Sequence, residues 1–313
     1  MGEHEMPIPS KSVIYETLNN TRHLPAPTQL SLFSKNDSDT DNEYWYYSDL
    51  HNLFGEGCFP TTCGMKSYTW TKIIMPYEQK LNTTYTPATP DFFDGHIIDF
   101  SHSYNLDGHS FKNANDLRIS RYGCWCLSRD NPYMIFARTY FLSPIIRSDM
   151  NFSDMQNLSY QFARPHLRHR LTQYERQLAG IINKHNGDFR QINHSMARTL
   201  FYGYSTADIK SQYHIPERTG DPIANYMGAA SLNAKAAALH DAITIFNNAP
   251  RQNINVLSEI LYHELTRQRI KMIRDLDTRP ELDIFCTPVS QVQNQMKNTE
   301  RNFIYTYQNK RIR

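Results

Sequence analysis

Histidine and carboxylate side chains that could hold a metal ion are concentrated in one polar stretch of the chain. This stretch carries His96, His102 and His109 together with Asp94, Asp99 and Asp107. Residues of these types can bind a catalytic metal or transfer protons, as in a metal-dependent nuclease. Loop histidines and aspartates are, however, mostly exposed groups without a chemical role. A nuclease that uses His96, His102, Asp99 and His109 is therefore only a weak hypothesis, which ranks below the two binding functions given at the end of this section. We predict no metal site.

Other patterns that mark catalytic or cofactor sites are incomplete or missing. The segment His263–Arg267 (HELTR) is similar to a zinc-protease helix, but Arg267 occupies the position that requires a second histidine. Cys124 and Cys126 are separated by one residue, whereas zinc and redox pairs have two intervening residues, so we expect buried thiols. The sequence contains no GxxxxGKS, GxxxxGKT, GxGxxG or GxSxG motif. We therefore predict a protein that is not an enzyme and has no cofactor.

Arginines beside aromatic residues are the remaining candidates for function. Arginine pairs with phosphate through two hydrogen bonds and stacks on bases, and aromatic side chains provide stacking platforms. The predicted DNA-binding residues are Arg118, Arg121, Arg129, Arg138, Arg164, Arg168 and Arg170. The pattern is repeated further along the chain by Arg267, Arg269, Lys271 and Arg274. All of these residues could equally form solvated helix faces whose charge is offset by acidic neighbours such as Glu175 and Glu264.

Two helices must position the first arginines of this set. Ser120 is a suitable N-cap for a helix with apolar residues at steps of three and four. Pro132 begins a second helix, which Pro144 closes. The stretch Leu117–Leu142 is therefore predicted to form a helical hairpin that carries arginines on a packed aromatic scaffold.

The surrounding segments predict an α+β fold. Residues 96–100 (HIIDF) and 116–120 (DLRIS) have the pattern of strands, and the Asp-Gly and Asn-rich chain between them is typical of a long hairpin connection. From Asn151 onwards the chain is predicted to be almost wholly helical, with Asp221 as the N-cap of one helix. The other expected helices are Gln161–Lys184, His194–Tyr202, Ala207–Tyr213, Ala229–Phe246 and Asn255–Leu276. Strands followed by helices favour an α+β domain and a mostly helical domain rather than a repeating parallel unit.

The composition is that of a globular protein with at most a local basic surface. The chain has 313 residues, enough for two domains, of which 40% are hydrophobic and 20% charged. A formal net charge of +2 is too mild to establish a nucleic-acid partner. The odd number of cysteines, the acidic N-terminus and the lack of a long apolar run predict a cytoplasmic protein that does not use a membrane.

Changes in composition divide the chain into four predicted parts. Residues 1–42 form a loosely ordered arm, because they end in the polar, acidic stretch KNDSDTDNE. Residues 43–150 form the α+β domain and residues 151–287 the helical domain. Residues 288–313 form a basic tail that ends in KRIR.

Five blocks of sequence carry a resemblance to a known family. They are WYYSDLHNLFG (Trp45–Gly55), ISRYGCWCL (Ile119–Leu127), ARTYF (Ala137–Phe141), YMGAASLNAKAAALHDAITIF (Tyr226–Phe246) and RPELDIFCTPVSQVQN (Arg279–Asn294). In order and content they resemble the bacterial DNA-damage-inducible protein D family, whose N-terminal half is similar to the Bro-N domain of phage antirepressors. The chain departs from the family at Ser48, where a basic residue is usual, and at Asp130-Asn131-Pro132, which shortens a family turn.

The resemblance implies a DNA-associated, non-enzymatic protein of the SOS damage response that interferes with recombinase filaments on DNA. Only Arg121 matches an arginine of a family block, and it could contact DNA or brace the hairpin through a buried carboxylate. Our first hypothesis is a regulator whose N-terminal domain binds single-stranded or duplex DNA. Its helical domain would bind a recombinase filament or a second copy of the chain as a homo-oligomer. The second hypothesis is an inhibitor that binds a recombinase or a host protein without contacting DNA.

Overall fold

The chain forms two compact units, each of which is described by itself. The computed structural model describes residues 27–46, 49–50, 97–100, 103–106, 109–112, 116–129, 135–146, 151–216, 221–250 and 252–310. Of these, residues 27–159 and 297–310 form one unit, here called the sheet unit, and residues 160–296 form the helical unit. The two divisions fall inside helices, after Ser159 and after Met296.

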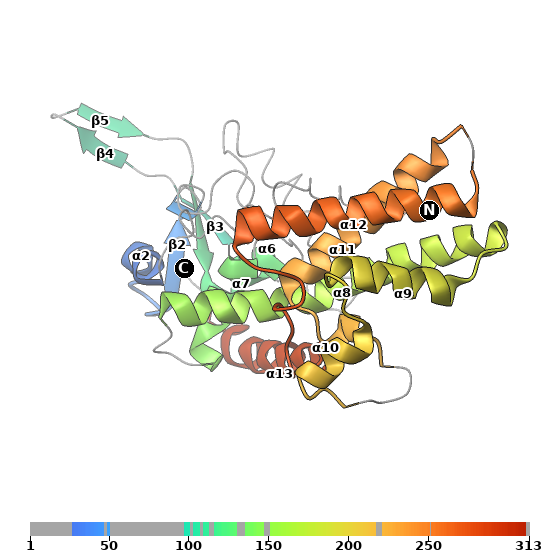
Figure 1. Cartoon of the computed structure of the whole chain (residues 1–313). Helices are drawn as coiled ribbons and strands as arrows, with labels where there is room; N and C mark the ends of the chain where they lie inside the picture. Colours follow the sequence, from blue (N-terminus) through green and yellow to red (C-terminus); the bar gives the residue numbers. More distant parts are fainter. Residues whose placement is uncertain are drawn as a thin grey trace. The chain divides into compact units, whose positions relative to one another are not determined.

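A small antiparallel sheet organises the sheet unit and confirms the general α+β class. Its strand order is β1-β2-β6-β3, and each neighbouring pair is antiparallel. The predicted pairing of residues 97–100 with 116–120 is confirmed, with Ile97 opposite Ile119. The connection between them contains a separate two-stranded hairpin, β4-β5 (Figure 1). The strands are β1 (Lys35–Asn36), β2 (Glu43–Tyr46), β3 (Ile97–Phe100), β4 (Ser103–Leu106), β5 (His109–Lys112) and β6 (Asp116–Ser120).

The predicted helical hairpin follows strand β6 as helices α6 (Arg121–Arg129) and α7 (Ile135–Ile146). Ser120 caps α6 as expected, because its Oγ accepts the N–H of Gly123 at 3.1 Å. Helix α7 continues past Pro144, where the sequence predicts its end. Pro144 has no N–H to donate, and the carbonyl of Tyr140 four residues earlier instead accepts the Ser143 hydroxyl at 2.7 Å. This substitute hydrogen bond lets the last turn of α7 form.

Part of the predicted N-terminal arm is ordered structure. Helix α2 (Pro27–Phe33) places Leu30 in the core, and the indole N–H of Trp45 donates to the Leu30 carbonyl at 3.0 Å. The acidic stretch that predicts a linker is the turn between β1 and β2. There the Asp37 carboxylate accepts the N–H groups of Asp39 and Thr40 at 3.0 and 2.9 Å. The segment has no periodic apolar residues to bury, and the local hydrogen bonds of Asp37 order it instead.

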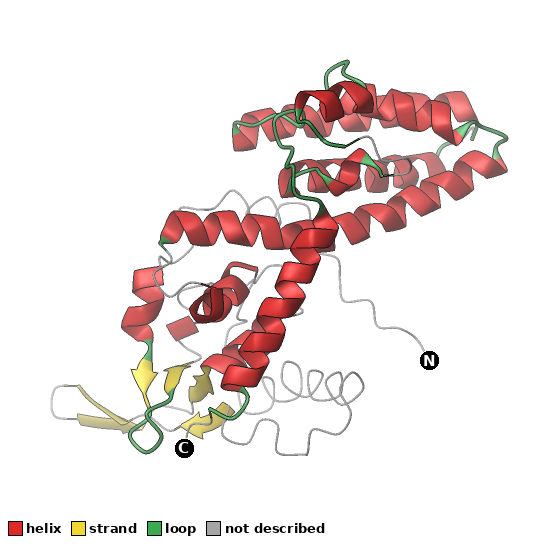
Figure 2. Cartoon of the chain, turned by 90° about the horizontal axis from the view of Figure 1, so that it is seen from below, coloured by secondary structure: helices red, strands yellow, loops and turns green. Residues whose placement is uncertain are grey.

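The second unit is helical, as predicted from Asn151 onwards (Figure 2). Helix α9 begins before its predicted start because Asp188 caps it, accepting the N–H of Arg190 at 2.8 Å. Asp221 does not cap an α-helix, since only the 3-10 turn η3 (Ile223–Asn225) follows it. The predicted basic tail is largely helix α13. The helices are α8 (Phe152–Lys184), α9 (Phe189–Leu200), α10 (Thr206–Gln212), α11 (Ala229–Asn247), α12 (Ile254–Leu276) and α13 (Val289–Tyr307).

Helix α11 is the centre of the helical unit. Its alanines are buried on several sides, and small side chains allow neighbouring helices to approach closely. Helix α12 packs along α11 and also contacts α9, so α9 and α12 lie next to each other. Among the helices that the structure describes, none combines the length and the apolar composition needed to cross a membrane.

Candidate nucleic-acid interface

Arg121, the arginine matched to the family block, is committed to partners inside the sheet unit. It is buried, and its Nε donates to the Glu43 carboxylate at 2.7 Å. Its Nη1 donates to the carbonyls of Tyr140 and Phe141 in helix α7. The Tyr140 carbonyl would otherwise lack a helical donor, because Pro144 has no N–H. Its guanidinium lies 4.9 Å from the ring centroid of Trp45. This geometry matches the bracing role, in which a carboxylate holds the arginine against the hairpin.

The other arginines predicted in the hairpin are also paired where their side chains are described. Arg118 lies 3.9 Å from the Asp37 carboxylate and over the ring of Tyr44. Arg138 forms an ion pair with Glu300 of helix α13. The side chain of Arg129 lies outside the described residues. The hairpin therefore offers little unpaired positive charge among the residues that the structure describes.

Arg164 and Arg168 of helix α8 hold the turn before α11 in place. Arg164 has no exposed surface and donates to the carbonyls of Met227 and Thr287, both at 2.9 Å. Burial lowers the pKa of Arg164 to about 10, against the opposing effect of the Asp283 carboxylate. Arg168 donates to the Asn225 side chain at 3.0 Å and lies 3.2 Å from Glu175. Both guanidinium groups therefore form hydrogen bonds inside the helical unit.

Arg170 has the fewest contacts among the predicted arginines whose side chains the structure describes. Its guanidinium lies 5.8 Å from the ring centroid of Tyr174, which is a weak cation–π distance. No ion pair of Arg170 occurs among the described side chains. DNA binding by the seven predicted arginines therefore stays a prediction.

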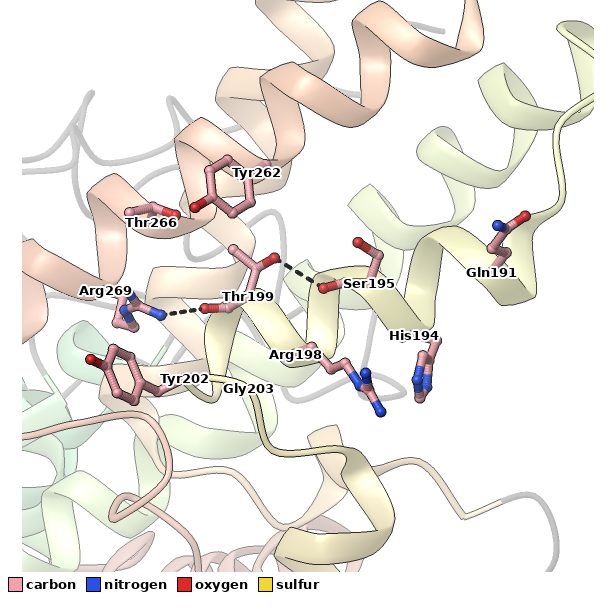
Figure 3. A pocket seen from close by; sticks show the side chains of 10 residues that line it. All are labelled: Gln191, His194, Ser195, Arg198, Thr199, Tyr202, Gly203, Tyr262, Thr266 and Arg269. Carbon is pink, nitrogen blue, oxygen red and sulfur yellow. Dashed lines mark hydrogen bonds between the residues drawn. The ribbon is translucent and has the colours of Figure 1, made fainter.

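A basic and aromatic groove between α9 and α12 was not identified from the sequence. It has a volume of about 610 Å³ and lies wholly within the helical unit (Figure 3). None of its lining residues is acidic. We call it the α9–α12 groove. The side chains that line it include His194, Arg198, Tyr202, Tyr262, Thr266 and Arg269.

Tyr202 closes the end of α9 in an unusual backbone conformation. Its φ is 53° and that of Gly203 is 96°, so two successive residues occupy the left-handed region. The turn is held by the Gly203 N–H, which donates to the Arg198 carbonyl at 2.7 Å. A residue with a Cβ pays about 1–2 kcal/mol for this conformation, and glycine is the usual occupant. The turn nevertheless presents a tyrosine that is 71% exposed.

Arg269 of helix α12 fixes this tyrosine from one side. Its Nη1 donates to the Thr199 carbonyl in the last turn of α9 at 2.7 Å. Its guanidinium lies 4.9 Å from the centroid of the Tyr202 ring. Figure 3 shows Arg269 and Tyr202 together at one end of the groove, with Tyr262 on α12 above Thr199. The cation and the ring are therefore positioned by the backbone of both helices.

Helix α9 contributes His194 and Arg198 to the groove. His194 and Arg198 are both exposed and are four residues apart, so they lie on the same face of the helix. Figure 3 shows their side chains next to each other along one edge of α9. Arg198 also contributes to lowering the pKa of Asp208, but the main causes are hydrogen bonds with Ser205, in the capping box of α10. An anionic ligand would meet exposed positive charge here.

The sequence contains a partial signal for this groove. Arg269 belongs to the second run of basic residues, and Tyr202-Gly203 marks the predicted end of a helix. The contact between them joins residues from α9 and α12, and Thr199 and Arg269 are 70 positions apart. Spacing within one helix cannot reveal such a pair.

Metal ligands are the next group of candidate residues. Among the described residues, no group of three or more His, Cys, Asp or Glu side chains could hold a metal ion. His96 and His102 lie outside those residues, as do the side chains of Asp99 and His109.

No protein-family model, curated protein or solved structure matches this chain significantly.

Proposed function

We propose that this protein is a DNA-associated regulator that binds nucleic acid without chemical conversion, through the α9–α12 groove. The observation that carries the proposal is the exposed ring of Tyr202, which stacks against Arg269. Arg198 of helix α9 lines the same groove. Phosphate is attracted to arginine, and bases stack on exposed aromatic rings. Residues in strained backbone conformations are frequent at functional sites, and the positive φ of the exposed Tyr202 therefore supports the proposal.

The proposal moves the DNA contact predicted for the N-terminal domain to the helical unit. Arg121, Arg138 and Arg164 have internal partners, so their loss would act on stability before it acted on binding. The cytoplasmic role in the SOS response, with recombinase filaments as the target, rests on the resemblance of the five sequence blocks. A Bro-N-like character of the sheet unit rests on the same resemblance.

A protein-binding inhibitor is the second candidate, because helix α12 exposes apolar side chains. Ile270 and Ile273 are 55% and 41% exposed, and Tyr262 lies on the same helix with 56% of its surface exposed. Exposed apolar residues that cluster on one element are typical of protein contacts. On this alternative, the chain would bind a recombinase directly and Arg198 would be irrelevant to inhibition.

Fluorescence anisotropy with the full chain and labelled oligonucleotides tests the first proposal. The affinity should fall with salt, with a logarithmic slope of about 0.7 per phosphate contact on single strands or 0.9 on duplex. Arg198→Glu should weaken binding about tenfold, which corresponds to about 1.4 kcal/mol. Arg176→Glu is the matched control, since Arg176 is exposed on α8 and does not line the groove.

Four results would count against the proposal. No binding to any DNA at low salt would exclude it, and a salt-independent affinity would exclude phosphate contacts. Equal weakening by Arg176→Glu and Arg198→Glu would show that general positive charge, rather than the groove, carries the binding. Inhibition of a recombinase that survives Arg198→Glu would favour the protein-binding alternative.

A further inference from the structure

The ring of Tyr202 has one occupied and one open face. The Arg269 guanidinium covers one face at 4.9 Å from the ring centroid. The side chain remains 71% exposed, so most of its other surface is available to a ligand. An arginine stacked behind an aromatic ring leaves a flat, rigid platform of the kind on which a nucleic-acid base stacks.

The backbone around Tyr202 holds the platform in position. Tyr202 and Gly203 both have positive φ, and the hydrogen bond from the Gly203 N–H to the Arg198 carbonyl closes the turn. Arg269 in turn fixes the last turn of α9 through the Thr199 carbonyl. A stacking surface on such a turn loses little conformational freedom when a ligand binds.

A second aromatic side chain and a cationic edge complete the groove. Tyr262 is 56% exposed, and with Thr266 and Arg269 it lies on the face of α12 that lines the groove. Figure 3 shows His194 and Arg198 along the edge of α9 away from Tyr262. The groove therefore offers an exposed aromatic ring backed by Arg269 and a further positive charge at Arg198, which can contact the base and the phosphate of a nucleotide.

We infer, on the basis of the proposed function, that the α9–α12 groove selects single strands by stacking an unpaired base on Tyr202 while Arg198 contacts an adjacent phosphate. The volume of about 610 Å³ is in the range of small-ligand sites, which suits one nucleotide unit. Bases in a duplex are already stacked on each other, so they cannot present a free face to Tyr202. Stacking on tyrosine tolerates any base, and the binding is expected to depend weakly on sequence.

Three probes of equal length separate stacking from charge: an oligo-dT strand, an abasic strand with the same phosphates and no bases, and a duplex. Each is titrated against the full chain by fluorescence anisotropy. Oligo-dT should bind about tenfold more tightly than the abasic strand, as expected for one stacked base. Tyr202→Leu should remove this difference, measured as the ratio of the two affinities of the same variant.

Two further variants control for effects on folding. Tyr202→Phe keeps the ring and should retain the preference for oligo-dT. Tyr305→Leu removes another exposed tyrosine, 83% exposed on helix α13, and should change nothing. Leucine has a Cβ as tyrosine does, so Tyr202→Leu leaves the backbone strain as it is.

The outcomes distinguish this inference from the proposed function. Equal affinity for oligo-dT and the abasic strand, or full retention of the preference in Tyr202→Leu, overturns base stacking and leaves DNA association in place. Duplex binding as tight as oligo-dT binding also overturns the inference. If none of the three probes binds, the proposed function itself is wrong.

Discussion

Asp283 caps helix α11 from a distant part of the chain: its carboxylate accepts the N–H of Ser231 at 2.8 Å, across 52 positions. Its other oxygen accepts the hydroxyl of Tyr160 at 2.7 Å, and that hydroxyl accepts the N–H of Ala230. The N-cap residue itself, Gly228, has no side chain to serve. A tertiary contact therefore supplies what the local sequence lacks, and the first turn of the central helix depends on it.

Gly228→Ala should destabilise the protein because the space of its Cβ is occupied by Asp283. A Cβ built at Gly228 would lie 1.8 Å from Oδ1 of Asp283. Displacing the carboxylate breaks the cap, and overpacking alone costs about 1–3 kcal/mol. Gly180→Ala is the control, since nothing lies within 4 Å of the added Cβ and glycine inside a helix is unfavourable by about 0.5–1 kcal/mol. Urea unfolding should show opposite signs for the two variants, and equal stability of Gly228→Ala and the parent chain would contradict the cap.

Asp283→Asn should change how stability depends on pH. Burial raises the pKa of Asp283, although Ser231, Tyr160 and Arg164 act to lower it. A carboxyl whose folded pKa is above the unfolded value of about 3.9 contributes its full stability below that pH and loses it as the pH rises through the folded pKa. The stability of Asp283→Asn relative to the parent chain should therefore increase as the pH rises above about 4. A difference between the two chains that is constant over this range would contradict the raised pKa.

Glu175→Gln should have the opposite pH signature. Burial alone raises the pKa of Glu175, but Lys235 at 2.8 Å and Arg168 at 3.2 Å outweigh it and hold the pKa below its ordinary value. Stability from such a group is present above the unfolded pKa of about 4.3 and is lost as pH falls through the folded pKa. At pH 7 the variant should lose about 1–3 kcal/mol, because the buried Lys235 loses its anion. Thermal unfolding should show a loss that shrinks at low pH, and a loss that is the same at pH 7 and pH 3 would contradict the ion pair.

The secondary structure was predictable where its causes are local. Ser120 is followed by an amphipathic helix, and α8 ends at Lys184 as predicted, followed by Asn186 at a φ of 59°. Asp188 was missed as a helix cap because it directly follows the signals that end α8. Pro144 predicts the end of α7 too early, because the sequence does not show that Ser143 and Arg121 replace the missing donor.

The candidate site was less predictable because it depends on long-range pairing. The sequence identifies arginines but not their partners, and Glu43 lies 78 positions from Arg121. Arg118, Arg121 and Arg138 have acidic partners inside the fold, while Arg198 is exposed in the groove. Positive charge in a sequence therefore predicts a surface only after the acidic partners have been located.

Arg121→Lys tests whether this arginine braces the hairpin. Lysine keeps the charge but cannot reach Glu43 and the carbonyls of Tyr140 and Phe141 together, because it has a single donor group on a flexible stem. We expect a loss of about 1–3 kcal/mol in the free energy of unfolding, since buried acceptors lose their partner. The affinity of the folded variant for DNA should stay within twofold of the parent chain. Arg274 is exposed and its Nε donates to the Asp275 carboxylate at 2.6 Å, so Arg274→Lys should change stability by less than about 0.5 kcal/mol. A stable Arg121→Lys variant with impaired DNA binding would instead assign Arg121 to the interface.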